Sequence, residues 1–424
     1  MALIVQKYGG TSVGDADRIK SIARRIALTR DEGNSVVVVV SAMGDTTDDL
    51  IRKAMEITDS PDLREFDALL ATGEQITMTL LAMALKSMGY PAISLTGAQA
   101  GIRTDTSHSR ARITRIEPKR VIRELDKENI VIVAGFQGVS EGEDITTLGR
   151  GGSDTTAVAL AASLGAAVCA KYSDIDGIFT ADPQLVPDAR PLSDISFEEM
   201  MEMANYGSQV IHPRAVELGE LFDIPILVAS SFNEKPGTLI HKEVSMEIRN
   251  KVRGIAYNLD VAKITVVGVP DRPGIATAIF VPLAEAGISV DTIVQNASIE
   301  NITDLTFTVT KSQLKQAMDV VKPIAASIGA RECVSDSKLG SVSIIGTGMQ
   351  NAPGYAAKMF GALSRENINI HLITTSEIRI TCIINDDQIK EAVRALHRTF
   401  ELETTGETED IAPRRGKGKT ETAG

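Results

Sequence analysis

The sequence has 424 residues, of which 43% are hydrophobic and 24% are charged, and its formal net charge at pH 7 is −12. This length predicts at least two domains, and the composition is that of an ordinary soluble globular protein. The acidic balance argues against nucleic acid as the main partner. We find no apolar run long enough to predict a membrane span.

The N-terminal residues begin a strand pattern directly, without the basic and then apolar layout of a signal peptide, so we expect a cytoplasmic protein. Cys169, Cys333 and Cys382 are scattered in apolar segments, which favours buried, unreactive thiols. The histidines show no metal-ligand spacing, so no protein metal site is predicted. For His212, which precedes a proline, a structural hydrogen bond is favoured over catalysis.

The first 240 or so residues alternate short apolar runs with helical patterns, which is typical of a parallel β-sheet covered by helices. Serine, threonine or aspartate at the starts and glycine near the ends mark several of the helices. We predict strands over residues 2–6, 35–40, 91–95, 130–134, 167–171 and 225–229. We predict helices over residues 15–29, 72–88, 154–164 and 197–204.

A glycine-rich turn follows the first predicted strand and reads Lys7-Tyr8-Gly9-Gly10-Thr11-Ser12. Its two glycines allow an anion to approach the backbone, and the following helix N-terminus adds unpaired N–H groups. Lys7 adds a full positive charge. The Walker A spacing is absent. Taken alone, such a turn is equally well explained as a simple tight turn.

Two shorter segments carry polar groups at element ends. The segment from Ser41 to Thr47 follows the second predicted strand and offers hydroxyl groups. Glu74 lies at a predicted helix start, where the helix dipole stabilises a carboxylate. For Glu74 a favourable first-turn charge and a ligand contact remain equally good interpretations.

A second glycine cluster runs from Thr147 to Asp154 and contains three glycines and Arg150 directly before a predicted helix. Ser153 or Asp154 could be a plain N-cap. Three glycines exceed what capping requires, however, and an arginine suits bidentate recognition of a carboxylate or phosphate. A functional loop is therefore favoured.

A third loop, from Tyr172 to Pro183, begins at a strand end, where open α/β sheets bind their ligands. Asp174, Asp176 and Asp182 lack the spacing and the closing glutamate of an EF-hand. We favour a nucleotide-facing loop in which some of the acidic residues serve only the turn.

A domain boundary follows Pro236-Gly237-Thr238, and beyond it the chain repeats itself. The pair Pro273-Gly274 is echoed by Pro353-Gly354, and both follow similar apolar strands. Each copy predicts a ferredoxin-like βαββαβ module. We therefore divide the chain into residues 1–245, 263–336 and 337–400, followed by a polar, disordered tail at 401–424.

Together these motifs resemble the aspartokinases of the amino-acid kinase superfamily, and the segment 147–160 is most similar to the actinobacterial type regulated by lysine and threonine. The resemblance extends to about residue 400 and includes Thr72-Gly73-Glu74 and Gly135-Phe136-Gln137-Gly138. It implies an α/β fold: a three-layer α/β/α amino-acid kinase domain with a mainly parallel sheet, followed by two ACT domains.

The resemblance implies phosphorylation of the L-aspartate side-chain carboxylate by ATP with Mg²⁺, giving 4-phospho-L-aspartate. The positions matching the family's catalytic residues are Lys7 and Asp154. Those matching aspartate-binding positions are Ser41, Thr47, Glu74, Arg150, Gly151 and Ser153. Those matching ATP-binding positions are Lys7, Tyr8, Gly9, Gly10, Ser12, Ser173, Asp174, Phe179, Asp182 and Gln209.

The resemblance further implies that threonine and lysine bind as effectors at the paired ACT domains. Asn351 stands in the second module where an acid would be expected, which predicts a weaker pocket there. We also expect residues 250–262 to add a strand to the second module, and an oligomer formed through the ACT domains. One such oligomer would be an α2β2 assembly, in which the smaller subunit is translated from an internal start at Met246. The expected effector-binding residues are Asp271, Pro273, Gly274, Ile275, Ala276, Gln295, Asn296, Asn369 and Ile370.

Gln209 departs from the family pattern, in which a lysine facing ATP commonly precedes the His-Pro-Arg stretch. A neutral hydrogen bond to phosphate is weaker than a charge-assisted one. We therefore expect Gln209→Lys to lower the Michaelis constant for ATP in steady-state kinetics. An unchanged constant would show that this position does not contact phosphate.

Two alternatives stay open at this stage. A sibling kinase, such as one for acetylglutamate or glutamate, usually lacks the ACT pair. A non-catalytic amino-acid sensor would not need Lys7, Glu74, Arg150 and Asp154. A dinucleotide-binding dehydrogenase is disfavoured because the Gly-x-Gly-x-x-Gly fingerprint is missing.

Overall fold

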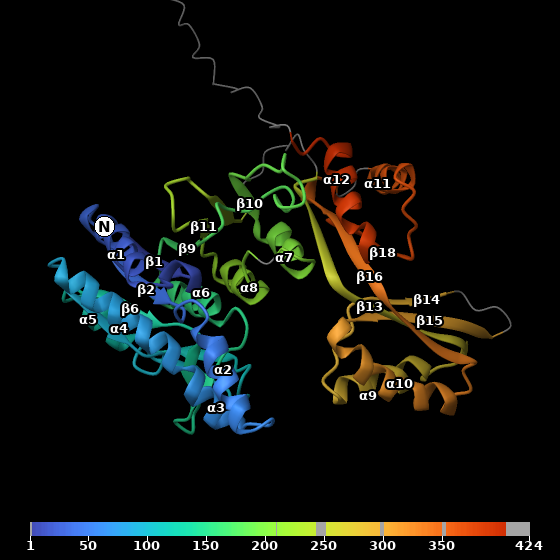
Figure 1. Ribbon diagram of the computed structural model, residues 1–424, viewed down its shortest axis with the longest axis horizontal. Helices are drawn as coiled ribbons and strands as arrows, with labels where there is room; N and C mark the ends of the chain where they lie inside the picture. The colour runs from blue at the N-terminus through green and yellow to red at the C-terminus, as the bar shows by residue number, and fades with distance from the viewer. Residues whose placement is uncertain (1, 209, 243–251, 297–300, 350–352, 404–424) are drawn as a thin grey trace, which may run out of the picture.

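The protein forms two halves that lie side by side in a computed structural model (Figure 1). The structure describes residues 2–208, 210–242, 252–296, 301–349 and 353–403. Gln209, Met246 and Asn351 therefore lie outside the described residues.

A mainly parallel sheet forms the centre of the N-terminal half, residues 2–242. Within the described residues it has eight strands in the order β10-β12-β11-β9-β1-β2-β6-β3. Its neighbouring strands pair in parallel, except for the antiparallel pair β11 and β12. The strands, in chain order, are β1 (Leu3–Tyr8), β2 (Ser35–Val40), β3 (Ala92–Leu95), β6 (Ile130–Ala134), β9 (Val168–Ser173), β10 (Asp194–Ser196), β11 (Ile226–Ser230) and β12 (Thr238–His241).

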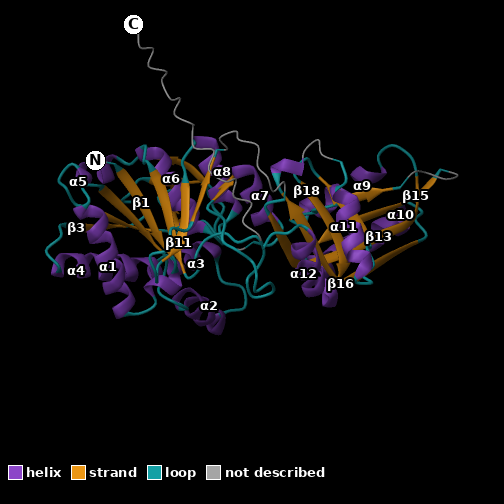
Figure 2. Ribbon diagram, turned by 90° about the horizontal axis from the view of Figure 1, so that it is seen from above, coloured by secondary structure: helices purple, strands orange, loops and turns teal. Residues whose placement is uncertain are grey.

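Helices cover both faces of this sheet (Figure 2). The valine run of β2 is buried on both faces of the sheet. Val37 and Val39 pack in one apolar cluster with α6, whereas Val36, Val38 and Val40 pack in another with α1 and α4. A strand buried on both faces reads as a continuous apolar run. The expected three-layer α/β/α fold is thus confirmed. The helices are η1 (Gly10–Val13), α1 (Ala16–Asp31), α2 (Thr46–Ile57), α3 (Leu63–Leu70), α4 (Thr72–Ser87), α5 (Lys119–Leu125), α6 (Gly152–Leu164), α7 (Phe197–Asn205) and α8 (Pro213–Phe222).

The six predicted strands and four predicted helices of this half are present, each with bounds within two residues of those observed. A small second sheet was not predicted, because its strands are only three or four residues long. It positions the loop that contains Arg150. Its order among the described residues is β5-β4-β7-β8, with β4 (Ile102–Thr104), β5 (Ile113–Ile116), β7 (Gln137–Val139) and β8 (Ile145–Thr147).

The C-terminal half, residues 252–403, is built on one continuous sheet with the order β14-β15-β13-β16-β18-β17 in the described residues. Two long strands run through both repeated modules. Residues 263–267 of β13 pair with 332–336 of β16, and residues 254–258 pair with 341–345. The first part of β13 therefore adds the last strand of the second module, which is the interlocking that the resemblance implies. The strands are β13 (Gly254–Pro270), β14 (Ile293–Gln295), β15 (Ile302–Val309), β16 (Glu332–Ile345), β17 (Leu372–Thr375) and β18 (Arg379–Asn385).

The repeated Pro-Gly pairs open equivalent helices in the two modules. Gly274 and Gly354 have φ angles of 94° and 103°, a left-handed conformation that favours glycine, and they directly precede α9 and α11. The internal repeat is thus a structural repeat. The helices of this half are α9 (Ile275–Glu285), η2 (Lys311–Gln313), α10 (Leu314–Ser327), η3 (Thr347–Met349), α11 (Tyr355–Arg365), η4 (Asp386–Gln388) and α12 (Ile389–Thr399).

The expectation that a solvated tail starts at Glu401 is wrong for its first residues. Leu402 is only 1% exposed and joins the apolar cluster of the second module. Its carbonyl oxygen also accepts a hydrogen bond of 3.0 Å from Arg190 Nε. The buried Leu402 side chain and the hydrogen bonds of its backbone thus hold the chain as far as residue 403. Residues 404–424 lie outside the described residues.

One segment also differs from the expectation about membrane spans. Leu63–Ser87, which comprises α3 and α4, is long and apolar enough to cross a membrane by length and composition alone. Half of its apolar window is buried inside the protein, and the core helices of soluble proteins pass the same test.

Candidate active site

A cavity of about 300 Å³ opens where β1 and β2 end and α6 begins. The carboxyl ends of neighbouring parallel strands meet at one edge of a sheet, which is where such folds bind ligands. The structure thereby brings together four segments that are separated in the sequence. Nine of the expected site residues line the cavity: Lys7, Gly10, Ser41, Thr47, Glu74, Arg150, Gly151, Ser153 and Asp154.

The first glycine turn packs directly against the loop after β2. A Cβ atom at Gly10 would lie 2.9 Å from the Ala42 carbonyl oxygen, and the Gly44 N–H donates to the Gly10 carbonyl oxygen over 3.1 Å. Gly9 donates its N–H to the Tyr172 carbonyl oxygen at the end of β9. A side chain at Gly10 would push the β2 loop away, so the turn needs glycine there for packing as well as for any anion.

Two of the residues expected to bind ATP turn their side chains elsewhere. Tyr8 is 0% exposed, stacks on Tyr172 and donates from its hydroxyl to Gln6. Ser12 is 1% exposed, and its hydroxyl lies 2.8 Å from that of Ser231. Their side chains belong to the packing below the turn.

The second glycine loop is shaped by close contacts. Gly149 and Gly151 have φ angles of 74° and 72°, and a Cβ atom on Gly151 would lie 2.2 Å from the His212 ring. The loop directs the N-terminus of α6 towards the cavity, and Arg150 is exposed at the rim. His212 itself caps α8, since its Nδ1 accepts from the Arg214 N–H over 3.3 Å. The structural role expected for His212 is confirmed.

Asp154 lies between two lysines. Its Oδ1 is 2.6 Å from Lys7 Nζ, and its Oδ2 is 2.5 Å from Lys171 Nζ. Burial raises the pKa of Asp154, but the attraction of Lys171 and Lys7 outweighs burial and holds this pKa well below its usual range. Asp154 is therefore ionised at any working pH.

Lys171 was not among the site residues predicted from the sequence. It lies on β9 and is the direct register partner of Lys7 on β1. A lysine directly after the apolar stretch Val168-Cys169-Ala170, within a predicted core strand, was the available signal, because a lysine is rarely buried unless it is paired.

Glu74 has one carboxylate oxygen without a partner. Its Oε1 accepts from the Ala42 N–H over 3.1 Å, whereas Oε2 is buried and makes no hydrogen bond within the described residues. Burial raises the pKa of Glu74 to about 7, against the lowering effect of backbone hydrogen bonds. A buried oxygen of this kind, in a cavity, is suited to accept from a cationic group of a ligand.

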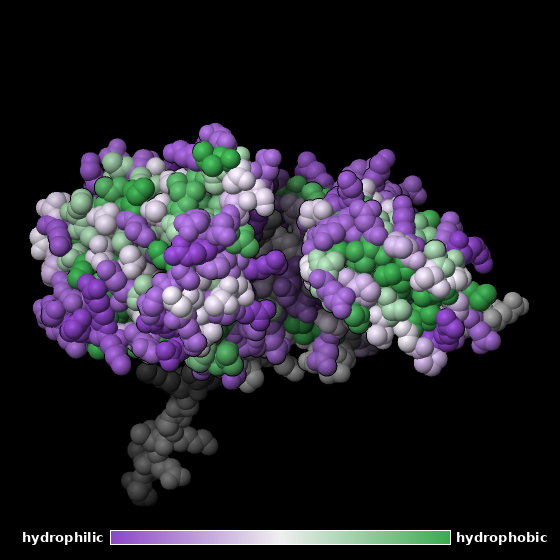
Figure 3. Space-filling view, turned by 90° about the horizontal axis from the view of Figure 1, so that it is seen from below, coloured by the Kyte–Doolittle hydropathy of each residue, from purple (hydrophilic) through white to green (hydrophobic). Residues whose placement is uncertain are grey.

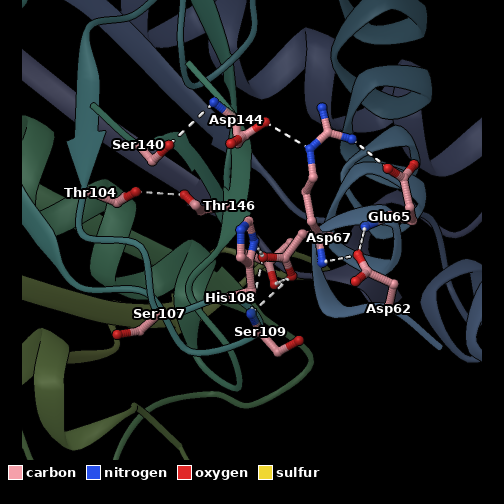
Figure 4. Close-up of polar contacts among 12 residues, drawn as sticks. Asp62, Glu65, Asp67, Thr104, Ser107, His108, Ser109, Ser140, Asp144 and Thr146 are labelled. Atoms are coloured by element: carbon pink, nitrogen blue, oxygen red, sulfur yellow. Dashed lines mark hydrogen bonds and ion pairs between the residues drawn. The ribbon is translucent and has the colours of Figure 1, made fainter. Parts of the chain in front are cut away.

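A buried aspartate, Asp67, bonds the turn at His108 and Ser109 (Figure 4) and also the strand end before the second glycine loop. Asp67 of α3 is 0% exposed and accepts from the Ser109 N–H at 3.0 Å and from the Thr147 hydroxyl at 2.5 Å. His108 Nδ1 lies 2.8 Å from the same carboxylate. Because Thr147 is two residues before Gly149, this network ties α3 to the loop.

We expect Asp67→Ala to loosen the loop without touching the cavity. The change leaves the buried Thr147 hydroxyl without its acceptor, which lowers the free energy of unfolding by about 1–3 kcal/mol, and the partly buried Ser109 N–H also loses its acceptor. The Michaelis constant for the ligand of the 300 Å³ cavity should rise several-fold. Denaturant unfolding and steady-state kinetics check both effects, with the exposed Asp17→Ala as control; wild-type stability would contradict the assignment.

The third loop lines a second and larger hollow. Phe179 and Asp182 face a space of about 550 Å³ together with Met203, and its other wall is formed by residues 255–260 of β13. Tyr257 donates its hydroxyl to Asp182 over 2.9 Å. The hollow thus lies where the loop after β9 meets the start of the C-terminal half.

The other residues expected in this loop are divided between two roles. Ser173 is buried at the end of β9, and its hydroxyl accepts from the Ile175 N–H over 3.4 Å, whereas Asp174 is exposed. Asp176 pairs with Lys235 at 2.6 Å and accepts from Asn233. Asp176 therefore serves the turn, as we expected of some acidic residues here.

A model of the amino acid kinase family matches residues 2–230, and models of the ACT domain match residues 263–326 and 342–400. An aspartate kinase of Stutzerimonas stutzeri is 50% identical over 405 residues, covering 95% of this chain and 98% of its own. The chain belongs to the aspartate kinase family.

An aspartokinase of Corynebacterium efficiens is 47% identical over 425 residues, covering 99% of this aspartate kinase and all of its own length. Among solved structures, Escherichia coli aspartokinase III in complex with aspartate and ADP is similar with a TM-score of 0.77 and 25% identity, covering 94% of this chain and 99% of that one. An aspartate kinase from Synechocystis is similar with a TM-score of 0.53 and 43% identity, over 94% and 70% of the two chains.

The ACT domains of this aspartate kinase contact the catalytic half through α7. Thr347 donates from its N–H and its hydroxyl to Glu199, each over 2.8 Å. Arg379 bonds Glu202 at 2.8 Å, and its guanidinium lies 3.8 Å from the centre of the Tyr206 ring. The helix that lines the 550 Å³ hollow with Met203 is therefore held by the second ACT domain.

The residues expected to bind effectors are largely exposed. Ile275 and Ile370 are partly buried, and the other seven are exposed. In the second ACT domain a hollow of about 200 Å³ lies at the start of α11 and is lined by Gly354, Tyr355, Ser376, Glu377 and Arg379. Ser376 and Glu377 therefore line a space within one module.

Two of the three cysteines fit the expectation of buried, unreactive thiols, whereas Cys333 is only partly buried. Cys169 and Cys382 are buried, which raises the pKa of both to about 12, and the cysteines form no disulfide within the described residues. Across the same residues, no group of three or more histidine, cysteine, aspartate or glutamate side chains could hold a metal ion.

Proposed function

We propose that this aspartate kinase binds L-aspartate in the 300 Å³ cavity and transfers the γ-phosphoryl group of ATP to its side-chain carboxylate. The unpartnered Oε2 of Glu74 carries this proposal, because it offers a buried acceptor for the substrate ammonium. The aspartokinase III to which the chain is similar is described as a complex with aspartate and ADP.

The remaining polar groups of the cavity suit the rest of aspartate. Arg150 at the rim can form a bidentate pair with a carboxylate. Ser41, Thr47 and Ser153 supply hydroxyl groups around it. Glu74 and Arg150 would thus fix the amino-acid end and direct the side-chain carboxylate towards Lys7.

The reaction needs positioning and charge neutralisation more than proton transfer. An oxygen of the substrate carboxylate, already ionised at neutral pH, forms a bond to the γ-phosphorus. The bond from that phosphorus to the oxygen bridging to the β-phosphate breaks, and ADP leaves with the electron pair. Lys7 and the N–H groups at the start of α6 neutralise the charge on the transferred group.

We propose that ATP lies in the 550 Å³ hollow, with its phosphates directed over β9 towards Lys7. Phe179 offers an apolar surface and Asp182 an acceptor at this hollow. Magnesium bound to the phosphates would neutralise part of their charge and keeps several waters in such sites, so it needs few protein ligands.

We further propose that lysine and threonine inhibit the enzyme through the ACT domains. The Arg379–Glu202 and Thr347–Glu199 contacts support this, because they connect the second ACT domain to the helix that lines the nucleotide hollow.

Assembly through the ACT domains also stays a proposal, as does an α2β2 form started at Met246. Apolar side chains gather on the side of the C-terminal half where α9 and α10 lie (Figure 3), and Val281 of α9 is 48% exposed. Exposed apolar patches often mark protein interfaces. A cytoplasmic location remains our prediction, and free thiols fit a reducing compartment.

The aspartate hydroxamate assay tests the proposed reaction. With ATP, Mg²⁺, hydroxylamine and L-aspartate, the purified protein should form aspartate hydroxamate, and lysine and threonine should lower the rate. Hydroxamate from glutamate but none from aspartate would assign a sibling kinase. No product with any amino acid would favour the non-catalytic sensor.

A further inference from the structure

Lys171 is a second buried lysine at the catalytic centre. Its Nζ is 2.5 Å from Asp154 Oδ2, and Lys7 Nζ is 2.6 Å from Oδ1 of the same carboxylate. The Lys171 side chain is 10% exposed and that of Lys7 is 9% exposed. The two ammonium groups therefore have the same partner and nearly the same access to solvent.

The three side chains do not balance in charge. Two ammonium groups share one carboxylate, and the other ionisable residues lining the cavity are the cationic Arg150 and Glu74, whose pKa is raised by burial to about 7. Cationic groups therefore outnumber carboxyl groups by three to two. Burial lowers the pKa of His212 nearby, which keeps its ring neutral. Excess buried charge is expensive unless it meets an opposite charge. The cluster therefore favours an anion as its further partner.

Lys171 also lies between the two proposed substrate sites. On one side, β9 pairs with β1, which ends at the aspartate cavity through Lys7. On the other side, β9 pairs with β11, and beyond Ser173 it continues into the loop with Phe179 that lines the nucleotide hollow. A phosphate chain that reaches from the hollow to the cavity must pass the end of β9.

We propose that Lys171 is a second phosphate-binding lysine of this enzyme, which contacts the β- and γ-phosphates of ATP beside Lys7 while Asp154 holds both ammonium groups in place. The proposal rests on the proposed function, since it needs ATP to bind in the hollow. Lys171 would provide a positive charge that the amide of Gln209 cannot.

Equilibrium binding of two nucleotides separates this role from a structural one. AMP lacks the β- and γ-phosphates, whereas the non-hydrolysable analogue AMP-PNP has both. For Lys171→Met we expect the affinity for AMP-PNP with Mg²⁺ to fall by about tenfold or more, since a charge-assisted phosphate contact is lost, and that for AMP to stay within about twofold. Isothermal calorimetry measures both. Lys127→Met, which removes a surface lysine from its partner Glu124, is the control.

A second pair of variants tests the alternative that Lys171 only neutralises Asp154. The Asp154→Asn substitution removes the negative charge that Lys171 would neutralise. In that background the alternative therefore predicts no further effect of Lys171→Met on AMP-PNP binding. We expect a smaller but measurable loss to persist there, because Lys171 keeps its charge although the carboxylate that positions it is gone. If Lys171→Met does not fold, Lys171→Gln keeps a hydrogen-bond donor for Asp154 and still removes the charge.

Equal losses for AMP and AMP-PNP, no loss for either, or a loss that disappears in the Asp154→Asn background would each overturn the proposal. These binding results are independent of turnover. A wild-type protein that forms no aspartate hydroxamate but loses AMP-PNP affinity on Lys171→Met would instead refute the proposed substrate and leave the phosphate contact standing.

Discussion

Replacing Asp154 with asparagine is expected to lower kcat by about 10²–10³-fold, the magnitude typical of losing one preorganised electrostatic group. The carboxylate holds the ammonium groups of Lys7 and Lys171 at 2.6 and 2.5 Å. A neutral amide cannot hold two cations that repel each other, so Lys7 would leave the position from which it meets the transferred phosphoryl group.

Steady-state kinetics with both substrates measures this effect. Asp17→Asn, on the exposed surface of α1, is the matched control and should keep wild-type kcat. A kcat for Asp154→Asn within about twofold of the wild type would show that the lysine cluster does not take part in the reaction.

Glu74→Gln is expected to raise the Michaelis constant for aspartate by about 10- to 100-fold, with a smaller effect on ATP. The change replaces a charge-assisted hydrogen bond to the substrate ammonium by a neutral one, and hydrogen bonds to charged groups contribute about 1.5–3 kcal/mol. Glu124→Gln, at a similarly buried carboxylate that pairs with Lys127 away from the cavity, is the control. An unchanged constant for aspartate would place the ammonium elsewhere.

Glu74 should also make kcat/KM for aspartate depend on pH. Burial raises the pKa of Glu74 to about 7, so the free enzyme has the ionised, ammonium-binding form above that pH. We expect kcat/KM for aspartate to rise with pH through about 7 and then to level, and this limb should be absent in Glu74→Gln.

The stability of the protein should change with pH in the opposite direction: Glu74 lowers it as pH rises. A glutamate in an unfolded chain has an ordinary pKa of about 4.5, and between this value and about 7 the folded state retains a proton on Glu74 that the unfolded chain releases. The contribution of Glu74 to the free energy of unfolding therefore falls as pH rises through this window. Thermal unfolding of the ligand-free protein at pH 5 and pH 8 should show a smaller loss in Glu74→Gln than in the wild type.

Much of the fold could be predicted because local patterns determine it. The apolar run of β2 indicated a strand buried on both faces, and the glycines before α6 indicated a loop at a helix start. Because the carboxyl ends of parallel strands meet, the convergence of Lys7, Glu74, Arg150 and Asp154 in one cavity followed from elements that the sequence placed correctly.

The features that were missed depend on contacts between distant parts of the chain. Lys171 acquires its role only through the pairing of β9 with β1, and no local pattern shows which strands will be neighbours. Tyr8 lies beside the glycine turn in sequence, yet strand alternation turns its ring into the core against Tyr172. Similarly, Leu402 is held by packing against the second ACT domain, which composition does not reveal.

A crystal structure with L-aspartate, AMP-PNP and Mg²⁺ would show directly where both substrates bind. We expect the aspartate ammonium at Glu74, the side-chain carboxylate facing Lys7, and the phosphates reaching from the hollow at Phe179 across the end of β9. Aspartate bound outside the 300 Å³ cavity, or a γ-phosphate remote from the Lys7–Asp154–Lys171 cluster, would contradict this expectation.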